Sequence, residues 1–189
     1  MNQAVTLPTE ASTPPSAPDD PPYEIIDGRK VEKPPMGNYE VLVASILVEK
    51  LAPHARAHGL GRVVCEMLFR INPAGNPQLR PDVAFVSYGR WARDRKVTSG
   101  DGWDVVPDLA IEVVSRSNTA SQVIRKVRKY LEANALRVWV VYPIERQVYI
   151  YDSPTRVRIL GPGEDLDGEG ILPGFHFPLA ELFEDGAEE

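Results

Sequence analysis

A single carboxylate interrupts an otherwise apolar segment, Leu109-Ala110-Ile111-Glu112-Val113-Val114. Burying an unpaired charge is costly, so Glu112 needs a partner if this segment forms a covered strand. One candidate partner is a basic side chain on a facing helix. The other is a divalent metal ion, which takes oxygen ligands and makes clustered acids tolerable. The pattern around Glu112 leaves both interpretations open.

A metal site needs a second carboxylate, and two Pro-Asp pairs supply the candidates Asp82 and Asp108. Asp108 lies four residues before Glu112 on the same expected strand, about 13 Å along it, which is too far to share one ion. Asp82 opens the preceding expected strand, so pairing of the two strands would bring it beside Glu112. We therefore predict Asp82 as the partner acid and Asp108 as a strand-edge or turn residue.

Lys126 is the third candidate, on a helix expected to start at a cap among Ser117, Asn118 and Thr119 and to run to about Asn134. At about 100° per residue, Lys126 falls directly beside the apolar arc of this helix. That placement lets its side chain reach a site at the sheet edge. A lysine whose stem packs on the helix while its ammonium reaches solvent fits the same pattern.

The elements that position these residues follow from periodicity and turn chemistry. Asp27-Gly28 predicts a tight hairpin within 23–33. Helical spacing covers 37–58, where Pro53 is expected to kink or weaken the last turns. Strands are expected over 61–71, 80–86, 108–115, 137–141 and 147–151, with Cys65 packed on the apolar face of the first. This order predicts an α/β (α+β) fold, a mixed sheet flanked by helices with an N-terminal β-hairpin.

The 189-residue chain has room for one domain, and its net charge of −6 is unevenly spread. Residues 41–160 carry 18 Lys and Arg against 11 Asp and Glu, whereas residues 161–189 carry nine acids and no Lys or Arg. We expect a disordered Pro-rich leader at 1–22, a single domain at 23–183 and an acidic tail at 184–189. The acidic C-terminal end is either a free solubilising tail or a competitor of DNA for the basic residues of 41–160.

The chain lacks the apolar runs and basic N-terminal region that membrane spans and secretory signals require. A cytoplasmic location without membrane contact is expected. The lone cysteine excludes an intramolecular disulfide framework and a Cys-based structural zinc site.

Several segments together resemble the Uma-two family of endonucleases in the PD-(D/E)xK restriction-endonuclease-like superfamily. The resemblance covers about residues 23–160 and rests on the following segments: Tyr23 to Lys33, Arg80 to Ser87, Pro107 to Ser115, Lys126-x-x-x-Tyr130 and Val138 to Pro143. It implies a restriction-endonuclease-like core that binds Mg²⁺, with Mn²⁺ as a substitute. The usual superfamily lysine, two residues after the glutamate, would fall at Val114, and the family's alternative position on the next helix matches Lys126.

The resemblance implies that Asp82 and Glu112 hold the metal and that Lys126 assists phosphodiester hydrolysis. Accessory candidates are Glu40, Glu66 and Tyr130. Arg116, where the family often has proline, adds positive charge near the site. The loop at 87–104 offers Arg90, Arg93 and Lys96, with Trp91 and Trp103, either as a nucleic-acid contact or as a solvated loop.

The sequence thus predicts a Mg²⁺-dependent DNA endonuclease with Asp82, Glu112 and Lys126 as its working site. The alternative is a non-catalytic member of the same fold that binds nucleic acid or protein. A homodimer is expected only because duplex substrates are symmetric.

Overall fold

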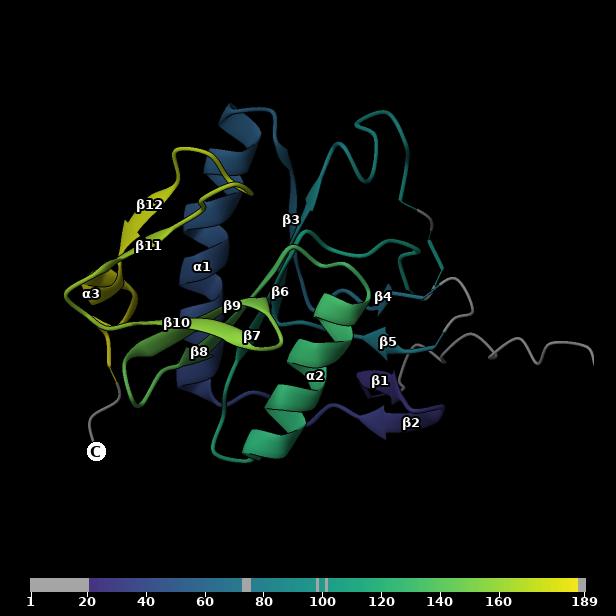
Figure 1. The fold of residues 1–189 in the computed structure, drawn as a ribbon, viewed down its shortest axis with the longest axis horizontal. Coiled ribbons are helices and arrows are strands. Elements are labelled where there is room, and N and C mark those ends of the chain that lie inside the picture. The colour runs from purple at the N-terminus through teal and green to yellow at the C-terminus, as the bar shows by residue number, and fades with distance from the viewer. Residues whose placement is uncertain (1–20, 73–75, 98, 101, 187–189) are drawn as a thin grey trace, which may run out of the picture.

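A six-stranded mixed sheet forms the centre of the molecule in the computed structural model (Figure 1), which describes residues 21–72, 76–97, 99–100 and 102–186. Nearly all of the leader expected at 1–22 and the end of the acidic tail at 187–189 lie outside these residues. The strand order is β10-β9-β8-β7-β6-β3. The bounds are β3 Gly61–Cys65, β6 Val83–Ser87, β7 Leu109–Val113, β8 Arg137–Tyr142, β9 Gln147–Ser153 and β10 Arg156–Leu160.

Two helices cover opposite faces of this sheet, α1 (Asn38–Ala57) and α2 (Ala120–Glu132). Side chains alternate along β7, so Leu109 and Ile111 pack in the core on the α1 side while Ala110 packs on the α2 side. Glu112 therefore faces α2. The mixed sheet flanked by helices confirms the expected fold class.

The register between strands brings the two predicted acids together. β6 and β7 are antiparallel, with Val83 opposite Ile111 and Ala84 opposite Ala110. One step further along the same register places Asp82 opposite Glu112. β7 and β8 are parallel and are joined through α2, so the strand with Glu112 leads directly into the helix with Lys126.

Both helices match their expected positions. Thr119 caps α2 through a capping box: its side chain accepts from the Gln122 N–H, and the Gln122 side chain accepts from the Thr119 N–H. The first helix runs through Pro53 as far as Ala57.

The N-terminal hairpin consists of β1 (Tyr23–Ile26) and β2 (Arg29–Glu32). Asp27 and Gly28 both have positive φ, 52° and 75°, as a tight two-residue turn requires, so the sequence prediction is confirmed. β1 also pairs with β5 (Gln78–Leu79), which pairs with β4 (Phe69–Arg70), to make a second sheet. The hairpin lies beside α2, where Lys129 donates to Asp27 Oδ1 at 2.6 Å.

The prediction of a single strand over 61–71 is wrong, because the chain leaves the main sheet after Cys65. Glu66 adopts a φ of 51°, which turns the chain toward β4 in the second sheet. The Glu66 N–H still bonds to the Asp82 carbonyl at 3.2 Å. Cys65 is exposed, so its expected packing in a strand face is also wrong.

The acidic C-terminal segment folds onto the α1 side of the molecule (Figure 1). It contains β11 (Asp165–Asp167), β12 (His176–Pro178) and α3 (Leu179–Leu182), none of which the sequence patterns indicated. Its side chains at Leu166, Phe177 and Leu182 are buried in the core that α1 covers. Up to Gly186, where the described residues end, the acids of this segment therefore do not cover the α2 face, on which Glu112 lies.

Candidate active site

Asp82 and Glu112 lie side by side at the ends of two paired strands and are almost completely buried, with 3% and 7% of their surfaces exposed. The backbone N–H of Val113 donates to Asp82 Oδ2 at 2.5 Å. This bond fixes the aspartate against the neighbouring strand. The adjacency of the two predicted acids is therefore borne out by the geometry.

Two side chains of α2 hold the Glu112 carboxylate. Lys126 Nζ donates to its Oε2 at 2.7 Å, and the Tyr130 hydroxyl donates to its Oε1 at 2.9 Å. Residues four apart share one helix face, which explains why both reach the same carboxylate. Lys126 therefore points inward and is the basic partner on a facing helix that was one of the two candidates for Glu112.

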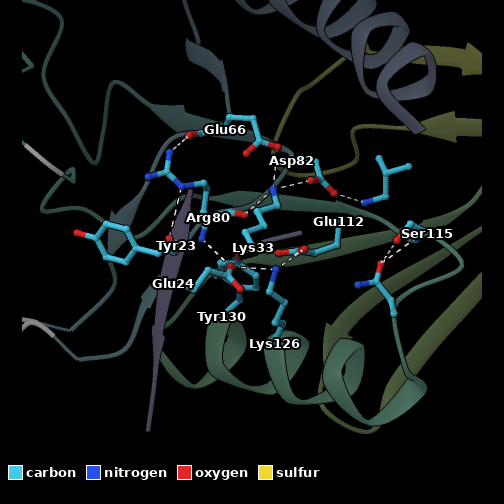
Figure 2. Close-up of polar contacts among 12 residues, drawn as sticks. Tyr23, Glu24, Lys33, Glu66, Arg80, Asp82, Glu112, Ser115, Lys126 and Tyr130 are labelled. Atoms are coloured by element: carbon cyan, nitrogen blue, oxygen red, sulfur yellow. Dashed lines mark hydrogen bonds and ion pairs between the residues drawn. The ribbon is translucent and has the colours of Figure 1, made fainter. Parts of the chain in front are cut away.

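Glu24 and Lys33 from the hairpin region complete the cluster (Figure 2), and the sequence patterns had not singled them out. Glu24 Oε1 lies 2.9 Å from Lys126 Nζ. Lys33 Nζ donates to both Glu66 Oε1 and Asp82 Oδ1 at 2.7 Å. The family resemblance had included this hairpin, but spacing along the chain does not reveal which side of the sheet it covers.

Arg80 connects the hairpin to the site through both its backbone and its side chain. Its N–H donates to Glu24 Oε1 at 2.9 Å, and its guanidinium donates to the carbonyls of Glu66 and Tyr23. The hairpin, the bend at Glu66 and the start of β6 are therefore linked through one residue.

The cluster contains more acid than base. Four carboxylates, Glu24, Glu66, Asp82 and Glu112, face two ammonium groups, those of Lys33 and Lys126. Burial raises the pKa of Glu112 to about 7, against the opposing effect of the Lys126 charge. Burial by itself would lower the pKa of each lysine, but the surrounding carboxylates raise it above the ordinary value. Burial, reinforced by Glu112, raises the pKa of Tyr130, so its hydroxyl remains a donor.

The two lysines and three of the four acids of this cluster, all except Glu66, line a cavity of about 520 Å³ between the hairpin and the N-terminal half of α2. Its polar lining includes Glu24, Lys33, Asp82, Glu112, Ser115 and Lys126. Two exposed arginines, Arg29 of the hairpin and Arg125 of α2, also border it. The cavity therefore has a mainly acidic interior, and its margin carries both signs of charge, because the exposed acids Asp27 and Glu32 also line it and Asp27 lies 3.9 Å from Arg125.

The structure separates the remaining predicted residues. Glu66 joins the site through Lys33, whereas the carboxylate of Glu40 lies against Gly37 at the start of its own helix. Arg116 is exposed on the loop between β7 and α2, next to Ser115, which lines the cavity.

The basic loop after β6 starts at the opposite end of that strand from Asp82. Arg90 forms an ion pair with Asp108 at 3.0 Å, and Asp108 accepts the Ser87 N–H, consistent with a strand-edge role. Arg93 and Lys96 are exposed. Trp91 and Trp103 are buried in the core, so neither indole ring is accessible for the nucleic-acid contact that was one interpretation of this loop.

The donor set suits a hard divalent cation, because it consists of carboxylate oxygens in excess over the local positive charge. In the part of the chain that the structure describes, no three Asp, Glu, His or Cys side chains converge as a metal-binding group. Ammonium groups instead lie between the acids. Asp82 and Glu112 thus fit Mg²⁺ by chemistry, provided that the lysines give way to it.

The combination of a mixed sheet, strand-end acids and an inward-facing helix lysine defines a class of α/β proteins with an acidic, lysine-containing cleft. A model of the Uma2 family, described as "Putative restriction endonuclease", matches residues 9–180. The chain therefore belongs to the Uma2 family, as the sequence motifs indicated.

One solved structure with the same fold is "a putative nuclease belonging to DUF820" from Anabaena variabilis ATCC 29413. It superposes with a TM-score of 0.74 at 19% sequence identity, over 86% of this chain and 89% of that one. None of the curated proteins matches the chain. Membership of the family supports nuclease function in general terms.

None of the helices in the described part of the chain has the length and hydropathy to cross a membrane.

Proposed function

We propose that this protein is a Mg²⁺-dependent DNA endonuclease whose site consists of Asp82, Glu112 and Lys126. The observation that carries the proposal is the contact of Lys126 with Glu112 at 2.7 Å beside the cross-strand Asp82. Two acids and one lysine, from separate parts of the chain, thus lie together in the lining of one cavity. Buried carboxylates in excess of their basic partners are costly, and such perturbed groups cluster at functional sites.

Asp82 and Glu112 would hold the ion through the carboxylate oxygens that the lysines now contact. Bound there, Mg²⁺ supplies neutralisation of the phosphate charge and activation of a water molecule. Lys126 orients the nucleophile or stabilises the negative charge that develops on the phosphate. Tyr130 holds the other oxygen of Glu112 and so keeps the carboxylate turned toward Lys126.

Three arginines at or near the cavity supply contacts for a polyanionic substrate. Arg29 and Arg125 border it, and Arg116 is exposed on the adjoining loop. Arginine contacts with phosphate are independent of sequence and position the nucleic-acid backbone. Neighbouring phosphates of DNA would be held there while one phosphodiester enters the acidic interior.

Incubation of the purified protein with supercoiled plasmid and Mg²⁺ or Mn²⁺ tests this proposal. We expect nicked or linear products, and a loss of at least about 100-fold in Asp82→Asn, Glu112→Gln and Lys126→Met. Glu181→Gln is the matched control, because this half-exposed acid lies on α3, on the α1 side.

Cleavage that survives in both Asp82→Asn and Glu112→Gln would overturn the site. DNA binding without cleavage at any metal concentration would favour the alternative, a family member that binds without cutting.

A further inference from the structure

Lys33 lies in a position that resembles a cation-binding site (Figure 2). Its ammonium group has an acceptor for each of its three hydrogens: Glu66 Oε1 at 2.7 Å, Asp82 Oδ1 at 2.7 Å and the Arg80 carbonyl at 3.2 Å. All three acceptors are carboxylate or carbonyl oxygens, the ligand type that Mg²⁺ also takes. The Lys33 ammonium therefore occupies an oxygen-lined position beside Asp82, one of the two predicted metal ligands.

The attachment of Lys33 permits its ammonium to move. The residue follows the last residue of β2 and precedes Pro34, outside regular secondary structure, and its backbone is fixed by a 2.8 Å bond from its N–H to the Pro22 carbonyl. The charge sits at the end of a flexible four-carbon stem, so the ammonium can change partners while the backbone stays in place. Lys33 also lines the cavity, which provides space for such a movement.

A divalent ion on Asp82 and the ammonium of Lys33 would repel each other at close range. The Lys33 side chain is only 11% exposed, so little solvent screens that repulsion. The two cations therefore compete for the same carboxylate. The Lys33 ammonium would then point into the space where a substrate phosphate lies.

We propose that Lys33 takes the place of the metal ion in the metal-free protein and becomes a phosphate contact when a divalent metal displaces it. This inference rests on the proposed function, because it assumes that Asp82 binds the metal. It gives Lys33 two opposite effects. Lys33 weakens metal binding, and it promotes cleavage once the metal is bound.

Calorimetric titration with Mn²⁺ measures the first effect. Lys33→Met should bind Mn²⁺ about tenfold more tightly than the unmodified protein, because a competing positive charge has been removed. Lys50→Met is the matched control and should leave the affinity unchanged, since Lys50 lies on α1 and pairs with Glu181. At saturating Mn²⁺, Lys33→Met should cleave plasmid DNA about tenfold more slowly.

A second measurement uses the unmodified chain and so does not depend on whether the variant folds. Brief treatment with an amine-acylating reagent, read by peptide mass spectrometry, should leave Lys33 protected without metal and modify it after addition of Mn²⁺. Lys50, which is 44% exposed, should react equally in both conditions.

The outcomes separate the two proposals. If the unmodified protein binds Mn²⁺ but Lys33→Met binds it no more tightly and Lys33 stays protected, only the role of Lys33 is overturned. If the unmodified protein binds no Mn²⁺, the metal-dependent function fails and this inference fails with it.

Discussion

At the scale of single residues, the site repeats one arrangement twice: a lysine shared by two acids. Lys33 lies between Glu66 and Asp82, and Lys126 lies between Glu24 and Glu112. Buried charges are tolerated when they are paired, but removal of one partner leaves an uncompensated charge. Each acid therefore compensates the charge of its lysine, and isosteric neutral substitutions are the cleanest probes.

Tyr130→Phe removes one hydroxyl from this network and keeps the buried ring. The Glu112 carboxylate then loses the 2.9 Å bond to Oε1. We expect the free energy of unfolding to fall by about 1–3 kcal/mol, since a buried acceptor loses its donor. We also expect a lower kcat with little change in KM, because the hydroxyl positions Glu112 without touching DNA. Urea unfolding and steady-state plasmid cleavage measure the two effects.

Tyr149→Phe is a suitable control, because Tyr149 is a partly buried tyrosine on β9 that packs beside Tyr142. If Tyr130→Phe matches Tyr149→Phe in both stability and kcat, Tyr130 does not position Glu112.

At the scale of elements, α2 is the part that brings two site residues to the sheet. Its start is fixed by the reciprocal bonds of Thr119 and Gln122. Lys126 and Tyr130 lie about two and three turns further on. The cap therefore stabilises the helix without touching the acids.

Thr119→Ala should destabilise the protein by about 1 kcal/mol, the usual effect of losing an N-cap side chain. Cleavage per folded molecule should be unchanged at a temperature well below the unfolding transition. Thr119→Ser, which restores the hydroxyl, should recover most of the loss. Chemical denaturation of the three proteins checks this, and a large fall in cleavage by a fully folded Thr119→Ala would show that the cap also shapes the site.

Local patterns predicted the elements whose determinants are local. The hairpin follows from Asp27-Gly28, the start of α2 from Thr119, and the pairing of Asp82 with Glu112 from two strands whose acids occupy matching ends. The end of β3 could not be predicted in this way, because alternation continues past Cys65 although the backbone turns at Glu66.

Non-local packing decided the remaining features. Glu24 and Lys33 reach the acids only because β1 pairs with β5 in a second sheet, and no periodicity records that contact. Trp103 stacks on Phe69, which is distant in sequence, and Trp91 packs against Trp103. The three-residue strands β11 and β12 are too short for a period-two pattern to indicate them.

At the scale of the whole molecule, charge is distributed between two sides. The acidic C-terminal segment packs on the α1 side, while the cavity and its arginines lie on the α2 side. As far as Gly186, this arrangement keeps the acids of the segment away from the cavity at which we propose that DNA binds. Net charge therefore says little about the partner, because the charge balance of one face decides it.

Truncation after Gly161 tests whether this segment is structural or an inhibitory cover. It removes the following buried side chains: Leu166, Leu172, Phe175, Phe177, Leu179, Leu182 and Phe183. At about 1.5–3 kcal/mol for each buried large apolar side chain, the loss is comparable to the total stability of a typical domain. We expect no cooperative thermal transition and no cleavage.

Truncation after Gly186 is the control and should melt and cleave like the full chain. A Gly161 truncation that remains folded and cleaves faster than the full chain would show that the segment inhibits the site instead.

The charged cluster also has a consequence for when the protein can act. Its six charged residues extend from Glu24 to Lys126, and each lysine bridges acids from different elements. A growing polypeptide on the ribosome therefore lacks a complete set of charged groups until residue 126 has emerged, and the domain core closes only when the C-terminal segment follows. A proteolytic cut between Glu24 and Lys126 leaves neither fragment with all six charged residues, so under the proposed function we expect such fragments to be unable to cleave DNA.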